Sequence, residues 1–389
     1  MNKQMNKQIR FIGLGIACMT FLCSCSHNEE TEESNRPVEL AVNTSIALTR
    51  AIETGTTFAN GQSIAVYANS ITTNATTNNY ALYTYASSGS KWSASGSDKI
   101  YLSAEPATIY AHYPAYSGMS TPLKVNDLAT SGVTASSTVN VATFEGTSAS
   151  ADDNNKITLT GSSNTADINA APGETDYMYA TKSSSTEQPQ ASNGKSTGSN
   201  SSLTKSVDLQ MNHALSMVSF RIYKDENYHN TGKLTKIELK NAGSNTPLSK
   251  ANAGHNTTMK ISDGTIAIPS DNQEGAVYTR YLYNDSNAGY TIQKAPGNSD
   301  PENSPAFSIL VFPIASIPAN AIKVTFTIDG TPYEISIPSS GSAQWEAGNN
   351  NIYKVTMNSI GLEIGTVTIK EWSKQPTVDG GNLVNTTNI

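Results

Sequence analysis

The chain has 389 residues, a formal net charge of −7 at pH 7 and three cysteines, all of them near its N-terminus. This length gives room for about two domains, and the acidic balance argues against nucleic acid as a partner. Because Cys18, Cys23 and Cys25 all lie in the N-terminal segment, the rest of the chain can form neither a disulfide nor a cysteine-ligated zinc site.

The N-terminus has the pattern of an export signal. Three basic residues precede an apolar run at residues 11–23, which is shorter than the roughly 20 apolar residues that span a bilayer. Leu22 and Ser24 occupy positions −3 and −1 relative to Cys25, where a lipoprotein signal peptidase would cut. We therefore predict that residues 1–24 are a signal peptide and that Cys25 is lipidated. An ordinary signal peptide, cut nearby and leaving no lipid, is the alternative.

A predicted strand and a protease-type site follow the cysteine. Residues 26–37 are polar and acidic, as in a flexible tether. Between Val38 and Leu48 the apolar residues share one parity and most polar residues share the other, which predicts a strand with one face toward a core. Directly after it, Arg50-Ala51 has the form of a site that is cut behind an arginine.

Shorter strands are predicted through the rest of the first half, separated by long polar loops. The loops at residues 117–170 and 182–205 are rich in Ser, Thr, Asn and Gly, and loops of this length indicate an exposed functional surface or a domain junction. Alternation of apolar and polar residues predicts strands at residues 63–68, 80–86, 100–102, 108–113, 139–144, 157–159 and 177–181.

The second half has a clearer strand pattern. Residues 207–223 alternate, with a change of apolar parity between Met217 and Val218 that predicts a bend or a bulge. Residues 307–314 are apolar on both parities, which predicts a central strand that is buried on both faces.

Two glycine signals complete this half. Asp329-Gly330 separates two alternating runs and predicts a tight hairpin, because both residue types accept the positive φ that such a turn needs. In residues 362–372 the apolar parity changes at Gly365, which predicts a bulge marked by the glycine.

This periodicity predicts an all-β protein made of two β-sandwiches in tandem. The boundary between them is placed near residue 205, although a cut after Tyr223 fits the pattern almost as well. The segments are then a signal peptide at residues 1–24, a lipidated tether with the first strand at 25–50, an N-terminal sandwich at 51–205 and a C-terminal sandwich with a C-terminal extension at 206–389.

The sequence offers no residue pattern for catalysis, and we expect a protein that is not an enzyme and needs no metal or cofactor. Residues 194–196, Gly-Lys-Ser, lack the first glycine and the strand-to-helix context of a phosphate-binding loop. Residues 152–155 lack the ligand spacing of a calcium loop. His112 and His213 fall in predicted strands without partners of a catalytic kind, so we expect packed or capping imidazoles.

Aromatic residues supply one further candidate site. Tyr80, Tyr83, Tyr85 and Trp92 could stack against a sugar, although aromatic residues in strands are ordinary core material. They motivate an alternative function, a surface glycan-binding lipoprotein that does not polymerise.

One further pattern is a set of segments at residues 49–51, 57–68, 109–114, 176–180, 209–215 and 345–353. Their order and spacing, across most of the chain from residue 38 to 372, resemble the Bacteroidales fimbrillin-like family.

The resemblance implies a pilus subunit with two transthyretin-like, Greek-key β-sandwich domains, made as an outer-membrane lipoprotein precursor. Cys25 would be lipidated and a protease would cut between Arg50 and Ala51, which would remove the strand at residues 38–48. A strand from a neighbouring fimbrial subunit, of the same or another kind, would fill the vacated groove; in this chain the donor strand would come from residues 361–389. Host or bacterial surface glycans or proteins are further implied partners, at the cell surface.

Overall fold

The computed structural model describes most of the chain between residues 36 and 371. The predicted signal peptide, Cys25, Arg50, Ala51 and the tail beyond residue 371 lie outside the described residues. The described ranges are 36–46, 58–69, 78–94, 98–117, 121–128, 132–148, 150–159, 168–243, 246–250, 256–269, 276–285, 287–295, 304–359 and 361–371.

Within these ranges the regular secondary structure is almost entirely β-strand, which confirms the predicted all-β class. The helical elements among them are two short 3₁₀ helices, η1 (Ser87–Gly89) and η2 (Gly198–Asn200). No helix in the described part is long and apolar enough to cross a membrane.

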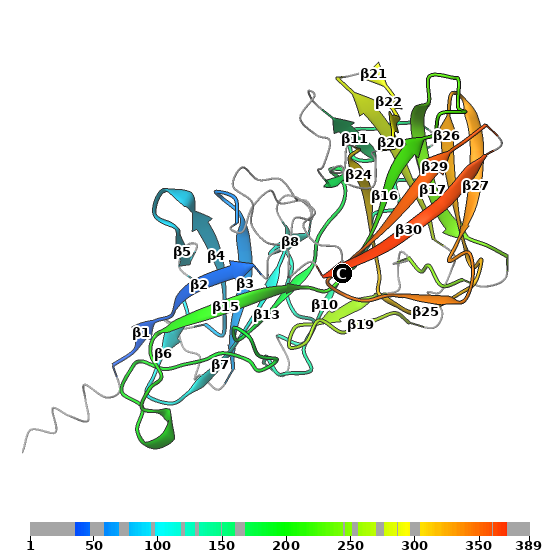
Figure 1. Cartoon of the computed structure of the whole chain (residues 1–389). Coiled ribbons are helices and arrows are strands. Elements are labelled where there is room, and N and C mark those ends of the chain that lie inside the picture. The colour runs from blue at the N-terminus through cyan, green and yellow to red at the C-terminus, as the bar shows by residue number, and fades with distance from the viewer. Residues whose placement is uncertain are drawn as a thin grey trace, which may run out of the picture.

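An eight-stranded sheet organises the first half of the molecule, with the order β2-β15-β13-β7-β3-β4-β5 and β14 paired with β7 (Figure 1). β2 runs parallel to β15, and the other pairings in this sheet are antiparallel. One face of the sheet encloses an apolar cluster. The strands are β2 (Ala41–Ile46), β3 (Ser63–Asn69), β4 (Tyr80–Ala86), β5 (Lys91–Ala94), β7 (Ala107–Tyr113), β13 (Met178–Thr181), β14 (Gln190–Ala191) and β15 (Ser206–His213).

Two sheets that face each other form the second half. Phe220 and Phe326, one from each sheet, meet with their ring centroids 5.5 Å apart inside the largest apolar cluster. One sheet contains β11 (Lys156–Leu159), β17 (Lys233–Asn241), β20 (Val277–Asn284), β21 (Asn287–Ala288), β22 (Tyr290–Thr291), β26 (Ile322–Ile328) and β27 (Thr331–Ile337). The other contains β12 (Ile168–Ala170), β16 (Ser216–Lys224), β23 (Gln293–Lys294), β24 (Ala306–Val311), β29 (Asn349–Met357) and β30 (Leu362–Glu371).

A third apolar cluster joins the two halves. It contains Tyr67 and Tyr110 from the eight-stranded sheet together with Met217 and Leu310 from the six-stranded sheet. Small sheets surround these layers: β1 (Val38–Glu39) with β6 (Tyr101–Leu102), β8 (Tyr116–Ser117) with β9 (Thr121–Pro122), β10 (Thr138–Asn140) with β18 (Thr258–Lys260) and β19 (Ile266–Ala267), and β25 (Ile314–Pro318) with β28 (Ser342–Trp345).

The chain crosses from the eight-stranded to the six-stranded sheet at Ala214-Leu215, between β15 and β16. This crossing lies between the boundary placed near residue 205 and the alternative after Tyr223. Strands do not divide between the halves in simple chain order, because β11 and β12 precede the crossing and still pair with β20 and β24.

The change of apolar parity between Met217 and Val218 does not mark the predicted bend or bulge. It has another cause. Met217 faces the cluster between the halves while Val218 faces the core of the second half, so both faces of β16 are buried at this point. The bend itself lies at Ala214-Leu215, just before β16 begins. Alternation cannot locate a bend in a stretch where every residue is buried.

Three other predictions for the second half are confirmed, whereas the strand predicted at residues 139–144 ends at Asn140. Every residue of β24 is buried, and its two faces contribute to two different apolar clusters. β26 and β27 form the predicted hairpin, with φ of 48° at Asp329 and 78° at Gly330. The bulge in β30 is also present: Tyr353 pairs with Val367 but Val355 pairs with Ile364, so β30 has one extra residue beside Gly365.

Candidate functional site

The first strand of the described chain, residues 38–46, closes a groove in the eight-stranded sheet. Leu40, Val42 and Ile46 are only 2%, 3% and 5% exposed, and their side chains belong to the core of the first half. Polar residues of the opposite parity, such as Asn43, face outward. The predicted one-sided strand is therefore confirmed over these residues, while Leu48 lies outside the described part. We call the surface under this strand the first-strand groove.

Main-chain hydrogen bonds hold the strand along its whole length. β2 lies in parallel register with β15, from Ala41 opposite Ser206 to Ile46 opposite Met211. At the start of the strand, the Leu40 N–H donates to the Ile100 carbonyl at 2.9 Å, and the buried Tyr83 hydroxyl donates to the Leu40 carbonyl at 2.9 Å. Contacts of this kind fit any extended chain, because they do not depend on its side chains.

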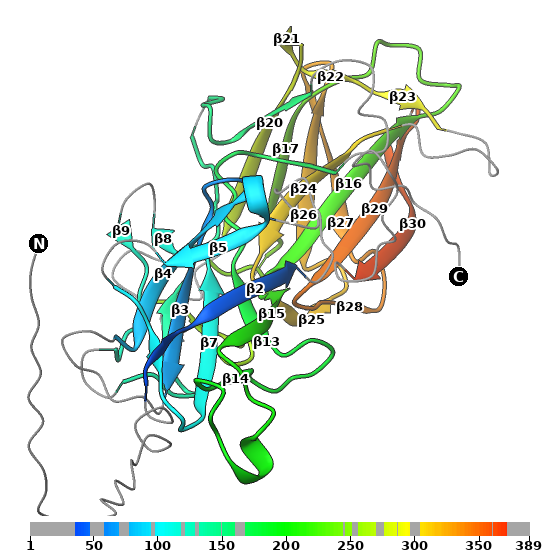
Figure 2. The same ribbon diagram turned by 90° about the vertical axis from the view of Figure 1, so that its left-hand side faces the viewer.

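The far edge of the sheet also reaches β2, because the sheet curls until β5 lies beside it (Figure 2). The indole N–H of Trp92 on β5 donates to the Thr44 hydroxyl at 2.9 Å. The Trp92 ring packs edge-on against Phe58, with 4.9 Å between centroids, and at a tilt of 50° against Tyr85, with 5.2 Å between centroids. Thr44 thus takes the one core-facing position of β2 that is polar, and it has a fixed partner there.

A second set of polar contacts lies on the outer face of the strand. The Asn43 amide donates to an Asp208 carboxylate oxygen at 3.0 Å and lies 3.3 Å from the Ser206 hydroxyl oxygen, both on β15. Lys99 pairs with Glu39 of β1 at 2.8 Å, and the hydrogen bond to that carboxylate raises the pKa of Lys99. These contacts are solvent-exposed, so they orient the strand more than they stabilise it.

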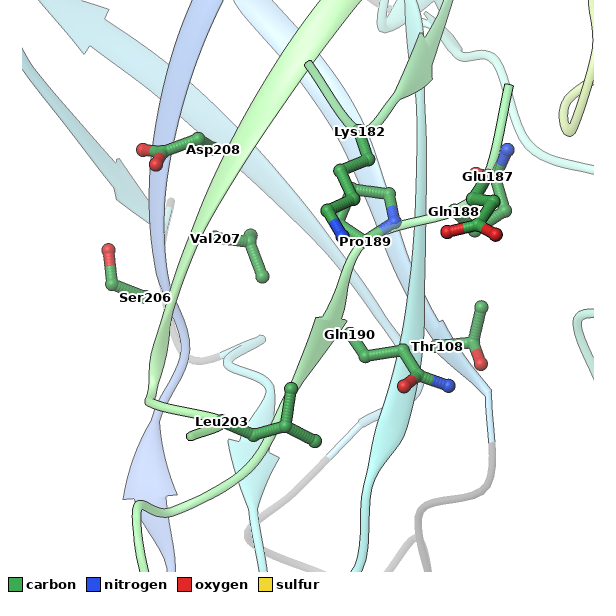
Figure 3. Close-up of a pocket in the computed structure, with 10 residues that line it drawn as sticks. All are labelled: Thr108, Lys182, Glu187, Gln188, Pro189, Gln190, Leu203, Ser206, Val207 and Asp208. Atoms are coloured by element: carbon green, nitrogen blue, oxygen red, sulfur yellow. The ribbon is translucent and has the colours of Figure 1, made fainter. Parts of the chain in front are cut away.

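A pocket of about 600 Å³ opens where the chain leaves the sheet between β13 and β14. It is lined by Thr108, Lys182, Glu187, Gln188, Pro189, Gln190, Leu203, Ser206, Val207 and Asp208 (Figure 3). In Figure 3 the side chains of Ser206 and Asp208 extend from β15 on the side opposite to Val207. The pocket and the first strand therefore share two residues of β15, and the polar loop at 182–205 is packed against the sheet through β14.

The predicted lipidation and cleavage residues cannot be placed, since Cys25, Arg50 and Ala51 lie outside the described residues. In the sequence, Arg50 and Ala51 fall between Ile46, the last residue of β2, and Phe58, where the description resumes. A cut between them would sever the only covalent link from the first strand to β3 and to all that follows.

The aromatic residues considered for sugar stacking are mostly core residues. Tyr80, Tyr83 and Tyr85 are 7%, 1% and 8% exposed, so their faces cannot receive a sugar. Trp92 is half-buried and contacts β2, as described above. The four residues confirm the interpretation as core material and do not form an open platform.

The two strand histidines are packed, as predicted. His112 is buried, with Nε2 3.0 Å from the Tyr67 hydroxyl and Nδ1 3.1 Å from the Pro114 carbonyl. Burial lowers the pKa of His112 to about 4. His213 Nδ1 lies 2.6 Å from an Asp176 carboxylate oxygen, with both side chains buried.

Asp152 belongs to a closed polar turn. Its carboxylate accepts hydrogen bonds from the Ser148 hydroxyl and from the main-chain N–H groups of Asn154 and Asn155. Among the described residues, no group of three or more His, Cys, Asp or Glu side chains could hold a metal ion.

Three features of the site were missed from the sequence. Two are the polar contacts of β2, through Trp92 and Asp208. The third is a fully buried ion pair between Glu174 and Arg280, which ties the segment before β13 to β20. Burial raises the pKa of Glu174 to about 7, while the Arg280 guanidinium opposes this rise.

Comparison with known proteins identifies the relatives of this chain. A family model described as fimbrillin-like matches residues 49–372. Among solved structures, a candidate cell adhesion protein from Bacteroides ovatus is 16% identical, with a TM-score of 0.53 over 87% of this chain and 98% of that one. A candidate cell adhesion protein from Bacteroides uniformis is 15% identical, with a TM-score of 0.50 over 86% and 98%. At these identities the structures show a common fold. No curated protein sequence matches the chain.

Proposed function

The chain belongs to the fimbrillin-like family, and on that premise we propose that it is a structural or adhesive subunit of a cell-surface fimbrium that assembles by donor-strand exchange. In this proposal the precursor is exported as an outer-membrane lipoprotein through Cys25. A protease cuts it between Arg50 and Ala51, the first strand leaves, and a strand from another subunit takes its place.

The observation that carries this proposal is the position of the first strand. β2 lies at the edge of its sheet, and yet its Val42 and Ile46, together with Leu40 just before it, are nearly inaccessible apolar residues of the core. Its loss would expose an apolar surface that includes Val207, Leu209 and Met211, and would leave one side of β15 without main-chain partners. An open edge beside an apolar groove is a surface that a strand from another chain can complete.

The position of the predicted cut fits this role. The family match begins at residue 49, so the first strand lies before the part of the chain that resembles the family. In a precursor that keeps its own first strand, the edge of β15 is covered and the chain cannot polymerise. Cleavage would therefore determine when assembly begins.

The decisive experiment follows the new N-terminus. Fimbriae sheared from cells that express the chain should contain subunits that begin at Ala51, and an Arg50→Gln variant should stay uncut and unassembled. Arg36→Gln is the matched control, since Pro37 follows that arginine and disfavours cleavage. If assembled fimbriae contain the intact first strand, the processing step is wrong for this subunit.

A further inference from the structure

The first-strand groove makes polar contacts of two kinds with its occupant, and only one of these kinds depends on the occupant's side chains. The β15 ladder and the Tyr83 hydroxyl contact main-chain atoms, which every strand possesses. Trp92 and Asp208 instead contact the side chains of Thr44 and Asn43. Asn43 and Thr44 are adjacent in β2 and face opposite sides of the sheet. The groove therefore contacts both faces of the strand that it holds.

We propose that Trp92 and Asp208 are specificity-determining residues that select a strand with a hydroxyl on its core face directly after an amide on its outer face. The inference rests on the proposed function, because the groove must lose its own strand before it can select another.

Trp92 supplies the stricter of the two contacts. An indole N–H can only donate, and here the Thr44 hydroxyl 2.9 Å away accepts its hydrogen bond, while Phe58 and Tyr85 pack against the ring. A strand with valine at this position would have the same shape and would cover the N–H without accepting its hydrogen bond. Replacing the hydroxyl leaves this half-buried donor without its hydrogen bond, so the site discriminates against a strand that lacks the hydroxyl.

Asp208 selects the neighbouring outward position. A carboxylate only accepts hydrogen bonds, so it favours an amide such as Asn43 and repels an acidic side chain in the same place. The contact is exposed and therefore weak, but it helps to set the register. A slip of one residue would turn the amide toward the core and the apolar side chains toward solvent.

The selection rule is tested in two ways with the same substitutions. First, Thr44→Val in the uncut chain should lower the folding equilibrium constant about tenfold, and Thr44→Ser should change it little. In a Trp92→Phe background, which has no indole N–H, the Thr44→Val penalty should fall to about twofold or less. An equal effect of Thr44→Val in both backgrounds overturns the role of Trp92.

Second, fluorescein-labelled peptides of residues 36–48 are bound to protein that has been cut behind Arg50 and freed of its strand in urea. The Thr44→Val peptide should bind about tenfold more weakly than the natural peptide, and only when Trp92 is present. The Asn43→Asp peptide should bind a few-fold more weakly, and an Asp208→Asn protein should remove that difference.

The peptide measurement separates the two proposals. Equal binding of the natural and Thr44→Val peptides to protein that has Trp92 overturns the selection rule. If the 36–48 peptide does not bind at all, strand exchange itself is wrong, and the uncut-chain measurement still decides whether Trp92 discriminates.

Discussion

The two terminal strands of the described chain, β2 and β30, both lie at sheet edges but are buried to very different degrees. Val42 and Ile46 of β2 are 3% and 5% exposed, whereas Val367 and Ile369 of β30 are 44% and 58% exposed. β2 is enclosed between β15 and β5, while β30 has a ladder neighbour on one side, β29 (Figure 2). The core of the first half therefore depends on its terminal strand, and the core of the second half does not depend on the outer part of its own.

This difference has a consequence for assembly. A strand that a core requires can control assembly, because its removal exposes an apolar surface that another strand must cover. A strand whose apolar residues already face solvent can be altered with little effect on the fold that carries it. The following substitutions test how far the two terminal strands differ.

The largest effect is expected from a charge placed in the core face of β2. Val42→Asp should lower the free energy of unfolding of the first half by about 5 kcal/mol, because a buried carboxylate must be desolvated and the valine contacts are lost. Ile369→Asp on β30 is the matched control and should change stability by no more than about 0.5 kcal/mol. Urea unfolding followed by tryptophan fluorescence measures both, in a Trp372→Phe background in which Trp92 and Trp345 are the remaining tryptophans. Comparable losses in the two variants would contradict the distinction between the strands.

The next effect concerns the ion pair that connects a segment preceding the crossing with β20. Arg280→Leu should cost about 4 kcal/mol, because it leaves Glu174, which is fully buried, without its charged partner. Burial already raises the pKa of Glu174, so the carboxyl is easier to bury when it is protonated. The loss should therefore be smaller at pH 5 than at pH 8.

Lys323→Leu is the control for that variant. Lys323 pairs with Glu334 at 3.1 Å, and both side chains are more than 40% exposed. This substitution should cost no more than about 0.5 kcal/mol. A small effect of Arg280→Leu, equal to that of the control, would mean that the buried pair is not a structural link.

Local patterns predicted the parts of the fold that depend on local rules. Asp329-Gly330 indicated its hairpin because both residues adopt positive φ, and residues 307–314 indicated a central strand because they are apolar on both faces. The crossing at Ala214-Leu215 could not be located in the same way. Both residues are apolar and buried, so the alternation of apolar and polar residues gives no signal at the point where the chain changes sheets.

The candidate site was predicted only where it depends on local alternation of apolar and polar residues. Parity alone placed Leu40, Val42 and Ile46 in a core, but it could not connect Thr44 to Trp92, because their contact depends on how far the sheet curls. The buried ion pair did leave a signal. Arg280 shares the parity of two buried residues of β20, and a charge on a core face requires a partner.

Acid should destabilise the first half through His112. Burial lowers the pKa of this histidine from 6.5 to about 4, so the unfolded chain binds the proton more strongly. The stability that neutral His112 contributes is present above pH 6.5 and is lost as the pH falls to about 4, a loss of about 3 kcal/mol. The difference in unfolding free energy between wild type and His112→Asn, measured from pH 7 to pH 4, isolates this term. A difference that does not change with pH would refute it.

The smallest effects come from two turn glycines, one in each half, and they compare the halves most directly. Gly61 and Gly330 have φ of 88° and 78°, and a Cβ added to either would meet no atom within 4 Å. Alanine at each should therefore cost about 1 kcal/mol through backbone strain alone. Gly61→Ala should shift the transition reported by Trp92, and Gly330→Ala the one reported by Trp345. If each variant shifts both transitions equally, the halves unfold as one unit, and the dependence on β2 extends to the whole molecule.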